Sequence, residues 1–198
     1  PTKALLRNAE VARLLTGGSR EYGFSVDNLE LDFGAAIERS RKVSSRLVKG
    51  VETLMKGNDV DVWMGEGRLT APDTIEVALN DGGRETLTAG AVILATGARA
   101  RLLPGVTADG EKVLTYREAL ELRDLPKSAI VIGAGPIGLE FATIWRSYGA
   151  EVTVVEMLDQ ILPAEDAEAA KELSRYLRRM RIKAMTSTRV QDVEATDD

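Results

Sequence analysis

One glycine-rich segment, residues 131–140 with the sequence VIGAGPIGLE, constrains the fold more than any other part of the chain. Its glycines follow the spacing G-x-G-x-x-G, an apolar run precedes them, and a helical pattern begins at Pro136. A second apolar run, EVTVVE, ends at the acidic residue Glu156, which lies 23 positions after Gly133. This separation is close to the roughly 20 positions typical of the motif. Strand, glycine turn, helix, second strand and terminal acid form the pattern of a dinucleotide-binding βαβ unit.

Each glycine has a distinct physical role in such a turn. Gly133 permits the tight bend, Gly135 lets the backbone approach a diphosphate, and Gly138 lets the helix pack close to the strand. Backbone amides and the positive end of the helix dipole then face the phosphates. The sequence therefore predicts a nucleotide site formed by Gly133, Ala134, Gly135, Pro136, Ile137, Gly138 and Glu140.

Glu156 is predicted to accept hydrogen bonds from the hydroxyls of the adenosine ribose. A carboxylate there repels a 2′-phosphate, and no arginine follows it in the sequence MLD, so the pattern favours NAD over NADP. Two structural alternatives stand beside this interpretation. The glycines could form only a sharp bend, and Glu156 could be a surface acid at the end of a strand.

Composition excludes several other classes of protein. The formal net charge of −5 argues against a nucleic-acid partner. No apolar run is long enough to span a membrane, and no signal-peptide pattern opens the chain, so we expect a cytoplasmic protein. The 198 residues contain no cysteine and no histidine, which removes thiol chemistry and the commonest general base from this stretch.

The periodicity predicts an α/β fold with two partial Rossmann-like domains of the three-layer β/β/α type and a small antiparallel meander. Residues 1–97 are expected to form part of an FAD-binding domain and residues 98–198 the first part of an NAD-binding domain, although the boundary could equally lie as late as Pro126. We expect helices over 2–15, 33–56, 136–148 and 166–181, and strands over 91–95, 129–132, 151–155, 184–187 and 190–194. The meander is expected within residues 59–90.

Four segments resemble dihydrolipoamide dehydrogenases, in the FAD-dependent pyridine nucleotide–disulfide oxidoreductase family, in matching order and spacing. They are PTKALL, VKGVETLMKGNDVDVWMGEGRLTAPDTIEV, VILATGARARLLPGV and VIGAGPIGLEFATIWRSYGAEVTVVEMLDQILP. The resemblance covers essentially the whole chain. It implies FAD and NAD as cofactors, oxidation of a dihydrolipoyl dithiol with reduction of NAD, a homodimer, and a dihydrolipoyl domain of a 2-oxoacid dehydrogenase or glycine cleavage complex as partner.

The same resemblance implies roles for residues outside the glycine turn. Lys3 matches a lysine beside the FAD, Gly67 a residue at its adenine end, and Thr96, Gly97 and Ala98 a turn that borders it. Glu140 matches a glutamate near the contact between nicotinamide and flavin, so we expect Lys3 and Glu140 to pair there. The alternatives are a solvated lysine, a bulge glycine, a plain strand end, and an acid that stabilises the helix dipole.

The resemblance also implies what this stretch lacks. A redox-active cysteine pair is expected before Pro1, and the first FAD fingerprint, a later FAD segment and a C-terminal interface domain with a His–Glu base are absent. We therefore expect a central piece of a longer enzyme, which holds parts of two cofactor sites, contains no catalytic residue, binds no metal, and is poorly stable alone. The rival functions are a sister reductase such as mercuric reductase, a soluble transhydrogenase, and a non-catalytic nucleotide-binding module or redox-sensing regulator.

Overall fold

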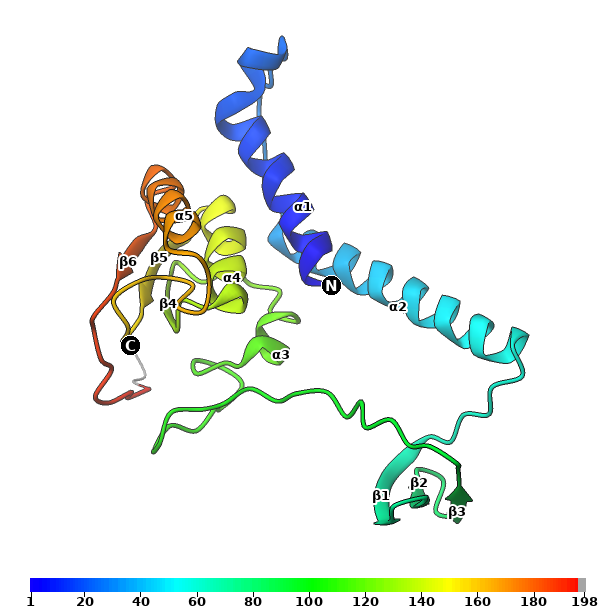
Figure 1. The fold of residues 1–198 in the computed structure, drawn as a ribbon. Coiled ribbons are helices and arrows are strands. Elements are labelled where there is room, and N and C mark those ends of the chain that lie inside the picture. The colour runs from blue at the N-terminus through cyan, green and yellow to red at the C-terminus, as the bar shows by residue number, and fades with distance from the viewer. Residues whose placement is uncertain (196–198) are drawn as a thin grey trace. The chain divides into compact units, whose positions relative to one another are not determined.

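Helices at the start of the chain are followed by an antiparallel sheet and then by a parallel sheet with its connecting helices (Figure 1). The computed structural model describes residues 1–195. Its residues form two units. One combines Pro1–Ser45 with the chain from Ala100 onward, and the other is Arg46–Arg99.

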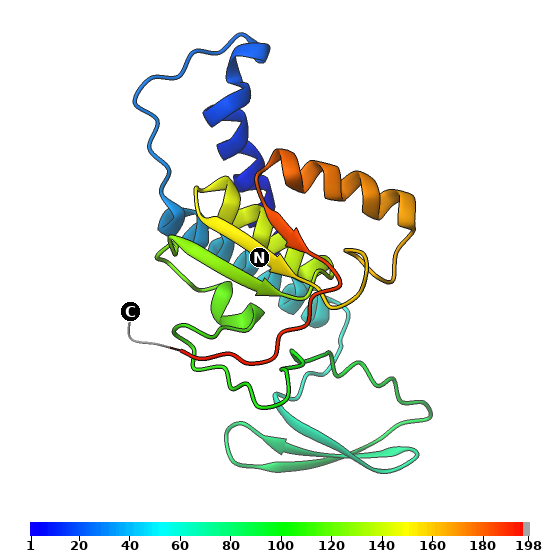
Figure 2. The same cartoon turned by 90° about the vertical axis from the view of Figure 1, so that its left-hand side faces the viewer.

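The parallel sheet of the first unit carries the predicted nucleotide motif. Its strands lie in the order β4-β5-β6, with Ser128 opposite Glu151 and Thr153 opposite Lys183. The elements are β4 Ser128–Ile132, α4 Pro136–Ser147, β5 Glu151–Val155, α5 Ala167–Arg179 and β6 Lys183–Met185. This βαβαβ order confirms the predicted α/β fold, and Figure 2 shows its three strands side by side.

Two helices open the first unit. Helix α1, Thr2–Arg13, buries Leu5, Ala9 and Ala12 on one face and continues into the π-helical turn η1, Leu14–Gly18, and the 3₁₀ turn η2, Ser19–Tyr22. Helix α2 spans Phe33–Gly57, and the Asp32 side chain accepts a 2.8 Å hydrogen bond from the Ala35 amide at its start. The apolar spacing of α1 fits its packing against α4.

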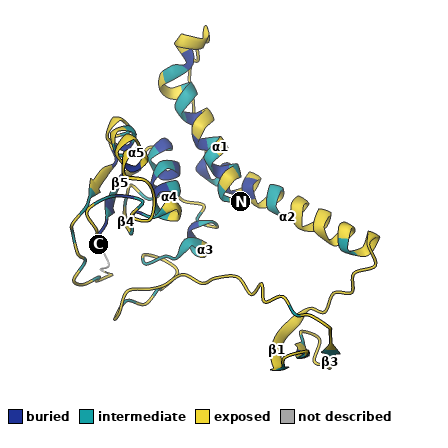
Figure 3. Ribbon diagram, viewed as in Figure 1, coloured by how far each residue is buried: buried dark blue, intermediate teal, exposed yellow. Residues whose placement is uncertain are grey.

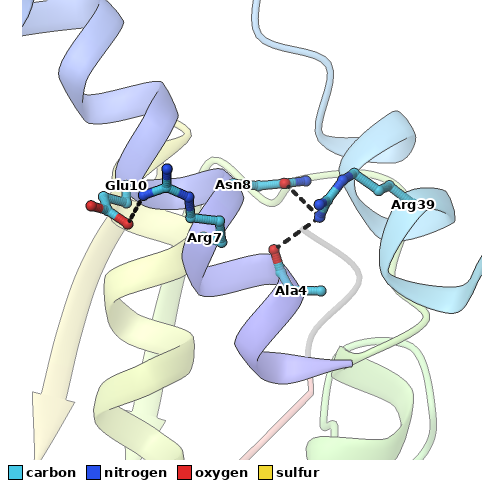
Figure 4. Close-up of polar contacts among 5 residues, drawn as sticks. All are labelled: Ala4, Arg7, Asn8, Glu10 and Arg39. Atoms are coloured by element: carbon cyan, nitrogen blue, oxygen red, sulfur yellow. Dashed lines mark hydrogen bonds and ion pairs between the residues drawn. The ribbon is translucent and has the colours of Figure 1, made fainter. Parts of the chain in front are cut away.

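A polar contact ties α1 to α2 (Figure 4). One guanidinium nitrogen of Arg39 donates to the Asn8 side-chain oxygen at 3.0 Å and to the Ala4 carbonyl at 3.5 Å. The ring of Phe33 in α2 meets the ring of Tyr148, which follows α4, edge to face at 5.2 Å. Both contacts fix the first part of α2 against the helices of the same unit.

The second unit contains the end of α2 and the antiparallel sheet. Strands β1 Gly65–Ala71, β2 Thr74–Leu79 and β3 Arg84–Thr88 lie in the order β1-β2-β3, with Gly67 opposite Val77 and Val77 opposite Glu85. The predicted meander is therefore confirmed.

The first unit also contains α3, Tyr116–Ala119, which the sequence analysis did not predict.

Buried and exposed residues lie in different parts of the chain (Figure 3). The described core gathers around α1, α4 and β5, where Leu5, Ile144 and Val154 are almost fully buried. By contrast, the second half of α2 exposes apolar side chains, and Ile130 on β4 is 72% exposed. Exposed apolar faces of this kind are typical of surfaces that another part of a protein or a partner covers.

Two predicted strands are wrong. Residues 91–95 and 190–194 form no strand, and Ile93 is 90% exposed. A β-branched run becomes a strand only where a neighbouring strand accepts its backbone hydrogen bonds, and among the described residues neither run has such a neighbour. Among residues 1–195, no helix combines the length and apolar character that crossing a bilayer requires.

Candidate nucleotide-binding site

The glycine turn between β4 and α4 has the geometry that its sequence predicts. Gly133 has a φ of +100°, a conformation that side chains disfavour, so the tight bend needs glycine. A Cβ on Gly138 would lie 2.3 Å from the Gly133 carbonyl oxygen and 3.0 Å from Cγ1 of Val131. Helix α4 therefore approaches the turn and strand as closely as only a glycine allows.

Gly135 differs from the other two glycines. Its φ of −73° suits any residue, and a Cβ added there would meet no atom within 4 Å. Packing inside the chain therefore does not require glycine at this position, and the space beside it stays open to a ligand. Pro136 occupies the first helical position, where its missing N–H costs nothing, and the amides of the first turn of α4 lack helical partners.

This cradle fits the diphosphate of a dinucleotide. Three features meet at the start of α4: an open space beside Gly135, first-turn amides that lack helical partners, and the positive end of the helix dipole. An anionic diphosphate needs this chemistry. Ile137 is exposed at the same helix start, and Ala134, in the turn, is fully buried. The residues present therefore support the predicted nucleotide site.

Glu156 lies just beyond the end of β5 and is only 9% exposed. Its Oε2 accepts a hydrogen bond from the Ala134 amide at 2.8 Å, and its Oε1 accepts one from the Leu158 amide at 2.9 Å. The alternative of a surface acid is therefore wrong, since the carboxylate turns toward the glycine turn. Sequence reasoning had assigned Glu156 to the ribose alone and missed these backbone contacts.

Lys3 and Glu140 form the ion pair that the family resemblance predicts. The Lys3 ammonium at the start of α1 contacts Oε1 of Glu140 in the first two turns of α4. The Lys3 side chain is 85% exposed and that of Glu140 is 25% exposed. An ion pair this exposed contributes only about 0–1 kcal/mol to stability, so stability alone explains little of its presence.

A cleft of about 370 Å³ lies beside this ion pair. Its walls come from α1, α4, α5 and the loop between β5 and α5, and its lining is mainly apolar. The lining residues are Leu6, Pro136, Leu139, Glu140, Thr143, Leu162, Glu165, Ala169 and Leu173. Pro136 and Glu140, two of the predicted nucleotide-binding residues, thus line a wide, open cleft.

The other residues predicted at the FAD lie in the second unit. Gly67 is exposed on β1, and a Cβ there would make only an ordinary 3.6 Å contact with Ile75. Thr96, Gly97 and Ala98 are exposed in irregular backbone, where Gly97 has a φ of +74°. Their contact with FAD stays a prediction. The glycine that strand pairing itself demands is Gly65, whose Cβ would lie 2.2 Å from the Ala78 carbonyl oxygen.

The phenol of Tyr148, at the end of α4, has a shifted pKa. Burial raises the pKa of the Tyr148 phenol, the nearby Asp32 adds to the rise, and a hydrogen bond from Asn8 and the charge of Arg39 oppose it. Asn8, Arg39 and Tyr148 together connect α1, α2 and the end of α4. Sequence reasoning missed these residues, because a lone polar residue on a helix carries no signal of its partners.

Together, the parallel sheet and its glycine turn define a class: Rossmann-type α/β proteins. The family model described as pyridine nucleotide-disulphide oxidoreductase matches residues 1–198, and the chain belongs to that family. The chain is 43% identical over 197 residues to a dihydrolipoyl dehydrogenase of Chlorobaculum parvum, covering 100% of this chain and 42% of that protein. It is also 43% identical over 196 residues to a dihydrolipoyl dehydrogenase of Mycobacterium leprae, covering 98% of this chain and 42% of the relative.

Solved structures agree with this fold. The crystal structure of LpdA from Mycobacterium tuberculosis matches with a TM-score of 0.83 and 27% identity over 94% of this chain and 41% of that one. A Cu(II) complex of the HOCl-induced flavoprotein disulfide reductase RclA from Escherichia coli shares the fold with a TM-score of 0.79 and 24% identity, over 100% of this chain and 41% of that one. The chain thus spans less than half the length of these relatives.

Proposed function

We propose that the complete protein containing this chain is an NAD-dependent dihydrolipoyl dehydrogenase. The main observation behind this proposal is the geometry of the glycine turn, where Gly138 packs against Gly133 while the space beside Gly135 stays open. Relatives named dihydrolipoyl dehydrogenase, which are 43% identical over nearly the whole chain, support the choice of reaction. The buried carboxylate of Glu156 supports NAD over NADP, because it would repel a 2′-phosphate.

In this proposal the chain's own residues bind and orient the cofactors. The first turn of α4 holds the diphosphate of NAD, and Glu156 accepts hydrogen bonds from the adenosine ribose. Lys3 and Glu140 lie where the nicotinamide meets the flavin, and Gly67, Thr96, Gly97 and Ala98 border the FAD. When bound, FAD carries electrons between a dithiol and NAD.

The catalytic groups, location and partners in this proposal belong to the complete protein. A dithiol–disulfide reaction needs a thiolate and a base, and this stretch contains neither cysteine nor histidine. We propose that other parts of the protein supply both. A cytoplasmic location, a homodimer and the dihydrolipoyl domain of a 2-oxoacid dehydrogenase or glycine cleavage complex as substrate carrier belong to the same proposal.

Purification of the complete protein tests the proposal directly. We expect a yellow protein that reduces NAD in the presence of dihydrolipoamide, with far lower activity toward NADP. A yellow protein that reduces Hg²⁺, or that transfers hydride only between NADPH and NAD, would identify a sister reductase or a transhydrogenase instead. A colourless protein that binds nucleotide without turnover would show a binding module and would contradict the proposal.

A further inference from the structure

The carboxylate of Glu156 accepts hydrogen bonds from backbone amides of the chain itself. Its two oxygens accept from the amides of Ala134 and Leu158 at 2.8 and 2.9 Å. Ala134 lies inside the glycine turn, and Leu158 lies in the segment that leaves β5. One side chain therefore joins the turn before α4 to the loop after β5.

Further hydrogen bonds fix the same junction from the backbone. The Gly133 amide donates to the Val155 carbonyl at 2.8 Å, and the Leu162 amide donates to the Ala134 carbonyl at 2.8 Å. Ala134, fully buried, is thus held at its amide by Glu156 and at its carbonyl by Leu162. Leu162 itself adopts a positive φ of 48°, so the loop reaches the turn in a conformation that leucine disfavours.

The chemistry of these contacts requires a carboxylate. Both groups that face Glu156 are N–H donors, and an ionised carboxylate is acceptor-only, with about four lone-pair sites. A glutamine offers one acceptor oxygen, and its NH₂ group would face the second N–H donor. The carboxylate also keeps lone pairs for ribose hydroxyls, so holding the turn and binding the ribose do not compete.

We propose that Glu156 is a positioning residue for the diphosphate cradle, in addition to its predicted contact with the ribose. It holds Ala134, and through it the amides that follow in the turn, in the geometry that receives the phosphates. This inference rests on the proposed nucleotide function of the turn. It differs from the ribose role in one respect that can be measured, because the positioning role operates when no ribose hydroxyl is present.

Two nucleotides separate the roles in the complete protein. The probes are NADH and its analogue that lacks both adenosine ribose hydroxyls, and the variants are Glu156→Gln and the control Glu151→Gln. Glu151 is exposed at the opposite end of β5, so its replacement removes the same charge from the same strand. The dissociation constants of both probes are measured by titration.

We expect Glu156→Gln to weaken binding of both nucleotides by about tenfold or more, the size of a lost charge-assisted hydrogen bond. Hydrogen exchange without nucleotide should also be about tenfold faster at the amides of Ala134 and Leu158, while Glu151→Gln changes neither property. If Glu156→Gln weakens NADH alone, leaving the analogue and the exchange rates unchanged, Glu156 serves only the ribose and the inference is overturned.

Separate measurements test the role of Glu156 and the proposed function. Failure of the unmodified protein to bind NADH contradicts the proposed function, whereas the exchange rates without nucleotide still test whether Glu156 holds the turn. If Glu156→Gln does not fold, Glu156→Asp decides, because its shorter carboxylate cannot span both donors. Weaker binding of both nucleotides by that variant supports the inference, and weaker binding of NADH alone overturns it.

Discussion

Replacing Gly138 by alanine is the sharpest test of the turn's packing. The new Cβ would lie 2.3 Å from the Gly133 carbonyl oxygen, a backbone atom that cannot move without opening the turn. Overpacking of this kind costs about 1–3 kcal/mol, whereas alanine in a helix gains about 1 kcal/mol over glycine. Because the clash involves a backbone atom, we expect a cost in the upper part of that range and a net loss of about 1–2 kcal/mol in the free energy of unfolding.

A matched variant separates stability from ligand binding. At Gly135 a Cβ meets no atom within 4 Å and φ is ordinary, so Gly135→Ala should keep the free energy of unfolding within about 0.5 kcal/mol. The same Cβ would enter the space proposed for the diphosphate, so NADH should bind about tenfold more weakly or worse.

Urea unfolding and NADH titration of both variants, in the complete protein, measure the two effects. A Gly138→Ala variant as stable as the unmodified protein would contradict the expected clash, and a Gly135→Ala variant that binds NADH equally well would contradict the proposed diphosphate position.

Three further predictions concern single side chains. Glu140→Gln should change the rate of flavin reduction by NADH, or the flavin absorption spectrum, with little change in stability; an unchanged spectrum and rate would leave only a helix-dipole role. Because burial raises the pKa of Tyr148, its neutral phenol stabilises the fold below about pH 10, and this stabilisation is lost as the pH rises through the raised pKa. Urea unfolding should therefore show that Tyr148→Phe loses less stability at alkaline pH than the unmodified protein. An equal loss in both proteins would refute that assignment. Replacing Glu156 by a neutral residue and adding an arginine after it should shift the ratio of NADH to NADPH binding toward NADPH, and an unchanged ratio would contradict its role at the ribose.

Local patterns with a fixed geometry were predictable from the sequence. The bend at Gly133 and the close approach at Gly138 follow from the glycine spacing, because each needs a missing Cβ within one short segment. The Lys3–Glu140 pair lies 137 positions apart and was predictable only through the family resemblance. Its presence in the structure confirms the pairing, while its position beside a flavin stays a prediction.

Features that depend on distant partners were not predictable. The apolar run at 91–95 has the composition of a strand, yet composition does not show whether a neighbouring strand exists. The two hydrogen bonds that the Glu156 carboxylate accepts depend on amides brought together by the parallel pairing of β4 and β5. By contrast, helix α3 could have been found, since Thr115 and Glu118 form a capping box that the sequence T-Y-R-E displays.

Hydrogen exchange of the complete protein with and without NADH measures whether the glycine turn and the end of β5 bind the nucleotide. We predict that NADH slows exchange at the amides of Gly135, Ile137 and Gly138 and at those of residues 156–158, because we propose that the diphosphate and the ribose lie against those two segments. Protection confined to other parts of the protein, with both segments unchanged, would contradict it.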